Sequence, residues 1–420
     1  MKKNLFSKIL LVFLLIIFSC LFIKGKDKKN HTPGFYKTIF WDRGKGLDDS
    51  NFPVFRHLDV SCDSNVDLDE EKQRKLICGN QYDLNGILLY PDNTPRYQVL
   101  FTPGGDSRNH GKFLTEKGIE NIRIFFRNGG SYVGICGGAA IACLSRENEK
   151  TWPEYYHLWP GYLEQLSQGP IYPNLKFEGN SDLLSYFSDL DKRMIQKVSF
   201  TYGSYPVNSG DSMPPGTKTH MRFDLNGSPL DGEVSCWSYK PSVYSGTMVA
   251  INCHPEVHSD GEQLELTKAL FLYAMDGIGK PRIKGKLIKG EIRKMNLSTL
   301  DRKWGFTKIG DGQIHHFVVE LKDSVENLTI SLTKAEDVDF NIFVNRGELA
   351  NPHQFLHSKN TAGTGNLILL GKQEAGNLYI GIHCLASVSG SIDSPDFFKK
   401  NSPVLNGTSY ELTVDWQEFK

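Results

Sequence analysis

The feature that most constrains the fold is a cysteine set between glycines directly after an apolar segment. Cys136 lies in the run Tyr132-Val-Gly-Ile-Cys-Gly-Gly-Ala-Ala. A strand that turns this sharply into a helix needs residues without bulk on both sides of the turn. The run therefore predicts a strand over 131–135 and a helix over 137–144. The thiol of Cys136 is placed at the start of that helix, where amide dipoles favour the thiolate.

A histidine and a glutamate supply the groups that a cysteine nucleophile requires. His254-Pro-Glu256 follows the apolar segment 247–252. His254 can move a proton to and from the thiol. Glu256, two residues on along the same predicted strand, points to the same face and can orient the imidazole. Cys136, His254 and Glu256 are thus the predicted catalytic residues, the alternative being a core cysteine near an unrelated histidine.

Attack on a carbonyl also requires hydrogen-bond donors for the charge that develops on oxygen. The N–H of Gly137, directly after the nucleophile, is one candidate. The run Pro103-Gly-Gly105 ends the predicted strand 97–102, and the N–H of Gly105 is the second candidate. Gly104 and Trp159, the latter from an aromatic-rich run, are weaker candidates for a substrate cleft. A plain tight turn and aromatic core packing are the competing interpretations.

The pattern of elements divides the chain into two folded parts. Residues 36 to 278 alternate strands and helices, including helices expected over 118–128 and 260–275, which is typical of an α/β, flavodoxin-like doubly wound sheet. Further strands are expected there over 197–202, 218–223 and 233–239. From about residue 295, short strands separated by Gly-, Asn- and Ser-rich turns predict an all-β sandwich. The predicted boundaries are 31–280 for the α/β domain, 281–300 for a linker and 301–420 for the sandwich.

The first thirty residues read as an export signal. An apolar run from 9 to 23 has lysines on both sides, so residues 1–30 are expected to be a signal peptide or an uncleaved membrane anchor. The protein is then secreted or tethered to the outer face of the membrane. An oxidising compartment permits disulfides, and Cys62 with Cys78 is the most plausible pair; buried free thiols are the alternative.

The equal numbers of basic and acidic residues argue against nucleic acid as a partner. The chain has 48 basic and 48 acidic residues, which gives no broad attraction to nucleic acid. His220 and His258 lack the spacing of a metal site, and no metal or cofactor is expected. Asp337 and Asp339 could bind calcium, although a solvated turn is the stronger interpretation.

Two segments resemble known families. Phe101-Thr-Pro-Gly-Gly-Asp106 and Gly130-Ser-Tyr-Val-Gly-Ile-Cys-Gly-Gly-Ala139, with His254-Pro-Glu256, resemble the class I glutamine amidotransferase-like superfamily, and within it the biotin-protein-ligase N-terminal-like domain. The resemblance implies a flavodoxin-like fold and a Cys-His-Glu triad at Cys136, His254 and Glu256. No synthetase, phosphate loop or biotin-ligase catalytic domain accompanies it, so hydrolysis is expected, as in the secreted γ-glutamyl hydrolases.

The C-terminal part is similar to the bacterial pre-peptidase C-terminal domain. Leu328-Thr-Ile-Ser-Leu332 and Asn377-Leu-Tyr-Ile-Gly-Ile-His383 carry that resemblance. It implies a β-sandwich appended to an exported hydrolase, with glycan or cell-surface contact as an expected role.

Together these features predict an exported cysteine hydrolase. It cleaves a carboxamide, γ-glutamyl or peptide-like bond of a small amide or peptide substrate through a thioester. The alternatives are a non-catalytic surface-binding module that keeps the cysteine turn as a relic, and a glutaminase subunit serving another protein.

Overall fold

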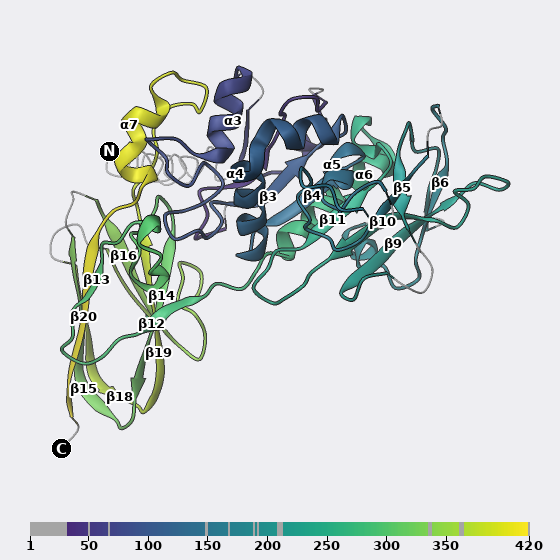
Figure 1. The fold of residues 1–420 in the computed structure, drawn as a ribbon. Helices are drawn as coiled ribbons and strands as arrows, with labels where there is room; N and C mark the ends of the chain where they lie inside the picture. Colours follow the sequence, from purple (N-terminus) through teal and green to yellow (C-terminus); the bar gives the residue numbers. More distant parts are fainter. Residues whose placement is uncertain are drawn as a thin grey trace, which may run out of the picture.

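A computed structural model describes most of the chain after the predicted leader. The described residues are 32–48, 51–65, 68–147, 150–166, 169–187, 190, 193–207, 213–334, 338–360 and 365–418. The predicted signal segment 1–30 and Asp337 lie outside them. Within these ranges no helix is long and apolar enough to cross a membrane. Figure 1 shows an α/β part joined to a narrower β-rich part.

The α/β part is built on a mixed sheet of nine strands. Five neighbouring strands run parallel, in the order β2 (Cys62–Ser64), β1 (Lys37–Trp41), β3 (Tyr97–Thr102), β4 (Ser131–Ile135) and β11 (Met248–Ile251). Four antiparallel strands extend the sheet: β10 (Val234–Tyr239), β9 (Thr217–Asp224), β6 (Asn174–Phe177) and β7 (Met194–Ile195). The predicted doubly wound sheet thus covers only the parallel half.

Helices cover both faces of the sheet. Strand residues alternate between two cores, so Val99 and Phe101 face one side and Leu100 the other. The Leu100 side is covered by α3 (Glu70–Cys78), α4 (Ser107–Arg127) and α5 (Gly137–Ile141), and the other side by α2 (Val54–His57) and α6 (Gly261–Asp276). The parallel strands all end at one edge, which therefore gathers the segments after β1, β3, β4 and β11.

The C-terminal part contains two sheets that share one core. The first has the order β12 (Ile283–Lys286), β14 (Ile314–Leu321), β19 (Gly376–Cys384), β16 (Phe340–Arg346) and β17 (His357–Asn360). The second has the order β13 (Arg293–Met295), β20 (Tyr410–Glu418), β15 (Val325–Lys334) and β18 (Gly365–Gln373). Phe317 and Val319 of the first sheet pack with Ile330 and Leu332 of the second.

Several predicted elements differ from those observed. α4 begins at Ser107, eleven residues before its expected start, with Asp106 accepting from the Asn109 N–H as its cap. α5 ends at Ile141 rather than 144. Segment 197–202 forms only isolated bridges, such as the one between Ser199 and His254. The expected linker 281–300 contains β12 and β13, and Lys284 in β12 is buried against Asp92 at 2.7 Å.

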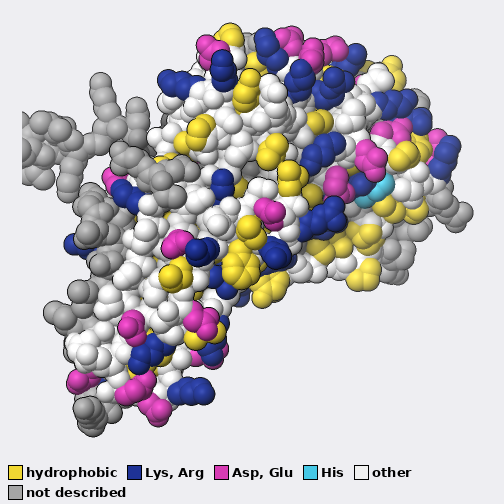
Figure 2. All heavy atoms as spheres, turned by 60° about the vertical axis from the view of Figure 1, so that its left-hand side comes forward, with side chains coloured by type: hydrophobic (Ala, Val, Ile, Leu, Met, Phe, Trp, Pro, Cys, Tyr) yellow, Lys and Arg dark blue, Asp and Glu magenta, His cyan; other side chains and the backbone are white. Residues whose placement is uncertain are grey.

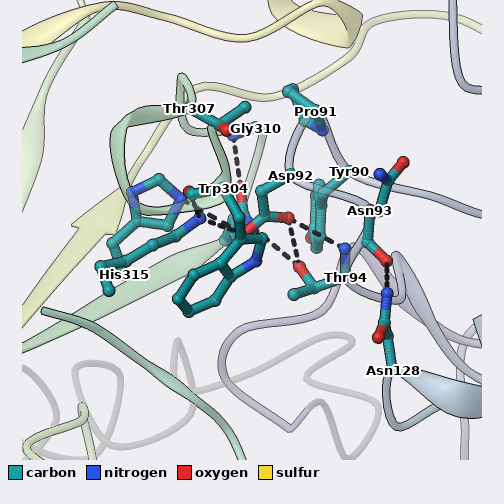
Figure 3. Close-up of polar contacts among 12 residues, drawn as sticks. Tyr90, Pro91, Asp92, Asn93, Thr94, Asn128, Trp304, Thr307, Gly310 and His315 are labelled. Atoms are coloured by element: carbon teal, nitrogen blue, oxygen red, sulfur yellow. Dashed lines mark hydrogen bonds and ion pairs between the residues drawn. The ribbon is translucent and has the colours of Figure 1, made fainter. Parts of the chain in front are cut away.

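Buried polar contacts join the two parts. The ion pair between Asp92 and Lys284 crosses the junction. On one side of it, Asp92 also accepts a hydrogen bond from Thr94 (Figure 3). On the other side, Lys284 donates to the backbone oxygen of Trp304 at 2.9 Å. Beside this cluster, the Arg96 guanidinium forms an ion pair with Asp311, and both side chains are sealed from solvent. The junction between the two parts is therefore buried from solvent at these ion pairs.

A helix from near the C-terminus strengthens the junction. α7 (Phe397–Leu405), which the sequence pattern did not predict, places Phe397 and Leu405 in the core that also holds the inner residues of α3 (Figure 1). The Asn406 amide donates to the Tyr82 oxygen at 2.9 Å. The chain then returns to the sandwich as β20.

Candidate active site

Cys136 occupies a strained turn between β4 and α5. Its backbone has φ 50° and ψ −107°, a conformation that a residue with a side chain adopts only where its surroundings impose it. The Cys136 N–H donates to the Ile251 oxygen at 2.9 Å, which continues the pairing of β4 with β11. Cys136 is half-buried as a residue, whereas the α5 residues after it are buried. This is the geometry that the glycine-bracketed sequence predicts.

His254 and Glu256 lie together, although not on one strand as expected. β11 ends at Ile251, and Glu256 lies in the 3-10 turn η2 (Pro255–Val257). That turn brings a Glu256 carboxylate oxygen to 2.8 Å from His254 Nδ1. The Glu256 side chain is fully buried, while that of His254 is 19% exposed. A buried acceptor on Nδ1 fixes the imidazole and leaves Nε2 for another partner.

Cys136 lies close to His254, since a side chain added at Gly104 would come within 3.4 Å of both residues. Burial alone would raise the pKa of the Cys136 thiol, but a hydrogen bond to His254 and the charge of that imidazole lower it below its usual range. For His254, burial disfavours the charged form, yet hydrogen bonds to Cys136 and Glu256 raise its pKa. Each of the two shifts favours the charged form of its group, the thiolate of Cys136 and the imidazolium of His254.

Arg146 is a further contributor that the sequence analysis missed. Its positive charge also lowers the pKa of Cys136. Its Nε is buried and forms no hydrogen bond among the described residues. No motif marks this arginine, because its position depends on how the chain turns after α5.

The loop after β3 lies directly against Cys136 and His254. An added side chain on Gly104 would lie 2.8 Å from His254 Cε1 and 3.4 Å from Cys136 Cβ. One on Gly137 would lie 2.7 Å from the nitrogen and 2.2 Å from the oxygen of Gly105. Only glycine permits such approach. Gly104, Gly105 and Gly137 are therefore brought together around Cys136, and Gly137, as the first residue of α5, has no intrahelical acceptor for its N–H.

Trp159 does not belong to this group. It is fully buried, donates from Nε1 to the Thr217 hydroxyl at 2.8 Å, and packs on Trp237 with ring centroids 5.4 Å apart. Tyr155 and Tyr156 are also fully buried. The aromatic run therefore forms core packing, and the expectation that Trp159 lines a cleft was wrong because aromatic spacing alone does not distinguish core from cleft.

The remaining thiols form no disulfide in the described part of the chain. Cys62 and Cys78, the expected pair, do not form a disulfide with each other. Cys78 Sγ donates instead to the Leu114 oxygen at 3.0 Å. Burial raises the pKa of Cys143, Cys236 and Cys253. Of the five cysteines compared, Cys78, Cys136, Cys143, Cys236 and Cys253, Cys136 alone has a lowered pKa.

The described residues contain no cluster of three or more side chains suited to a metal ion. His220 is held between Ser181 and Ser238 at 3.1 and 2.8 Å. Asp339 is paired with Lys334 at 3.1 Å.

One known protein family matches the segment of the chain that contains Cys136. Residues 89–181, which include β3, β4 and Cys136, match the family described as biotin-protein ligase, N terminal. This supports the predicted resemblance over that segment. No curated protein matches the chain.

Solved structures give weaker likenesses. PurLQS from Thermotoga maritima is 16% identical over 58% of this chain and 99% of its own, with a TM-score of 0.36. A putative GMP synthase component from Thermoplasma acidophilum is 13% identical over 57% and 95%, with a TM-score of 0.32. The pre-peptidase C-terminal domain of a Bacillus anthracis collagenase is 12% identical over 33% of this chain and all of its own, with a TM-score of 0.21.

Proposed function

We propose that this protein is a cysteine-dependent hydrolase of a carboxamide, γ-glutamyl or peptide-like bond. One observation carries the proposal: Cys136 is held at a strained strand-to-helix turn beside a histidine that a buried glutamate orients. Such backbone strain clusters at functional sites. The resemblance to amidotransferase-like proteins supports an amide as the bond that is cleaved.

The chemistry follows from the positions of the groups. The Cys136 thiolate attacks the carbonyl carbon, and the resulting oxyanion accepts hydrogen bonds from the backbone N–H groups of Gly137 and Gly105. The imidazolium of His254 gives its proton to the leaving amine, which departs and leaves an acyl thioester. Neutral His254 then takes a proton from water, whose oxygen attacks the thioester and releases the acid. Glu256 holds the imidazole throughout.

Alkylation of the thiol tests the proposal directly. Treatment with iodoacetamide at pH 7 should label Cys136 ahead of Cys62 and Cys78, and His254→Ala should slow this labelling at least tenfold, because the burial of the thiol is then no longer offset. Peptide mapping identifies the adduct. Labelling of the three cysteines at equal rates would contradict an activated nucleophile.

A substrate panel then tests turnover. Glutamine, γ-glutamyl and peptide amides are incubated with the wild type and with Cys136→Ala, and release of amine is measured. Equal turnover by both forms would remove the enzyme assignment and favour a binding module.

We also propose that the protein acts outside the cell. The lysine-flanked apolar run at 9–23 supports export. Expression of the full chain followed by fractionation tests this, with an intracellular protein of unprocessed mass as the contrary result.

A further inference from the structure

A short segment after β1 pairs through a single antiparallel bridge with the loop that follows β3. The Asp48 N–H donates to the Gly104 oxygen at 2.8 Å, and the Asp106 N–H donates to the Gly46 oxygen at 2.7 Å. Leu47 and Gly105 form an antiparallel bridge between these two hydrogen bonds. The segment Gly46–Asp48 is far from the site residues in sequence, and no motif marks it.

This pairing fixes the direction of the Gly105 N–H. The peptide bond between Gly104 and Gly105 is trans, so its C=O and N–H point to opposite sides. Because the Gly104 oxygen is held by Asp48, the Gly105 N–H must point away from the segment. That side faces Gly137, whose added Cβ would lie 2.7 Å from the Gly105 nitrogen. In the described part of the chain this N–H has no acceptor of its own.

Buried polar contacts anchor Asp42 and Arg43, which lie shortly before the segment. Asp42, at the end of β1, is fully buried and accepts from Asn65 Nδ2 at 2.9 Å. His110 Nε2, from the first turn of α4, lies 2.8 Å from the other Asp42 carboxylate oxygen. The Arg43 N–H donates to Asn65 Oδ1 at 2.6 Å. The chain that leads into the segment is therefore held against the sheet edge and α4.

We propose that residues Gly46–Asp48 are a positioning segment that aims the Gly105 N–H at the oxyanion, an inference that rests on the proposed function. Without the Asp48 hydrogen bond, the Gly104–Gly105 peptide is free to rotate, since both residues are glycine. Rotation would turn a carbonyl oxygen toward the developing negative charge. The thiolate itself, set by His254 and Arg146, would be unaffected.

Two reagents separate these effects without knowledge of the natural substrate. Iodoacetamide alkylates Cys136 by displacing iodide at a saturated carbon, with no oxyanion. p-Nitrophenyl acetate transfers its acetyl group to the same sulfur through a tetrahedral oxyanion and releases p-nitrophenolate. The ratio of the acetylation rate to the alkylation rate, each corrected with Cys136→Ala, therefore reports the oxyanion donors alone.

Asp48→Pro removes the N–H, and Asp48→Ala is the matched control that keeps it. Asp48 is not among the described residues with positive φ, which would exclude proline, and Leu47 before it lies in an antiparallel bridge. We expect Asp48→Pro to lower the ratio about 10- to 100-fold, with unchanged alkylation, and Asp48→Ala to leave it within about twofold of the wild type. An unchanged ratio in Asp48→Pro, an equal fall in both rates, or an equal effect of Asp48→Ala would each overturn the inference.

A second variant tests the inference if Asp48→Pro does not fold. If thermal unfolding shows that Asp48→Pro is unfolded, Asn65→Ala releases Arg43 and Asp42 from the anchor, and the same ratio must fall. An unchanged ratio in folded Asn65→Ala overturns the inference. A Cys136 that reacts with neither reagent in the wild type removes the proposed function, and this inference with it.

Discussion

At the scale of single residues, the state of Cys136 depends on a balance between burial and nearby charge. Burial of the thiol disfavours the thiolate, whereas His254 and then Arg146 favour it. Glu256 works against the thiolate through its negative charge, yet it holds the imidazole at 2.8 Å. The sequence identifies the cysteine, histidine and glutamate because each stands in a recognisable local run. It does not identify Arg146, whose effect depends only on distance in space.

The pH dependence of alkylation tests this balance. Thiolate reactivity should rise with pH through a midpoint below 9, because the pKa of Cys136 is lowered from that value. In Arg146→Met the midpoint should move upward by roughly 0.5 to 1 pH unit, since a positive charge is lost. Arg108→Met is the control, because Glu154 already pairs with Arg108. A midpoint that is equal in Arg146→Met and the wild type would contradict a role for this charge.

At the scale of elements, the sequence predicts helix and strand bounds best where the residues of the element itself carry the hydrophobic pattern. β3 and β4 have the bounds that the sequence predicts, because each is a largely apolar run that is soon followed by glycine, at Gly104 and at Gly137. α7 was missed because Pro403 lies within it and its charged face obscures the apolar stripe. It becomes a helix by packing on a core whose other buried residues lie between positions 40 and 250 of the sequence.

The contribution of α7 can be measured by truncating its buried anchor. Phe397→Ala should lower the free energy of unfolding by about 3 to 5 kcal/mol, through lost burial and a residual cavity. Urea denaturation followed by fluorescence gives the value. Lys399→Ala, at an exposed position of the same helix, should change it by less than about 0.5 kcal/mol. A cost for Phe397→Ala as small as that of the lysine control would show that α7 is not held on the α/β core.

At the scale of the whole molecule, the two parts share a buried polar junction while the exterior carries mixed charge. On the face seen in Figure 2, basic and acidic side chains are interspersed. Inside, Asp83 is fully buried, and both of its carboxylate oxygens lack hydrogen-bond partners within the described residues. Burial raises the pKa of Asp83 to about 7, against an opposing effect of Arg96.

This carboxyl makes stability depend on pH. Between about pH 4 and 7 the folded state keeps a proton on Asp83 that the unfolded chain has released, so the free energy of unfolding falls as pH rises through this window. Asp83→Asn should flatten that fall and be more stable than the wild type at pH 8. Urea denaturation at pH 5 and pH 8 measures the difference, and equal pH slopes for the two proteins would contradict the prediction.

The sequence by itself determined the parts that neighbouring residues decide: the strand, turn and helix around Cys136, the identity of its histidine and glutamate, and the change from alternating helices and strands to short strands. Only the tertiary structure decided that Gly46–Asp48 pairs with the loop after β3, that Arg146 lies near the thiol, that Trp159 is core, and that Lys284 and Arg96 are buried in ion pairs. Periodicity and turn chemistry act over a few residues and can be read directly. Contacts between distant segments depend on which surfaces meet after the chain has closed, and a single sequence carries no local mark of them.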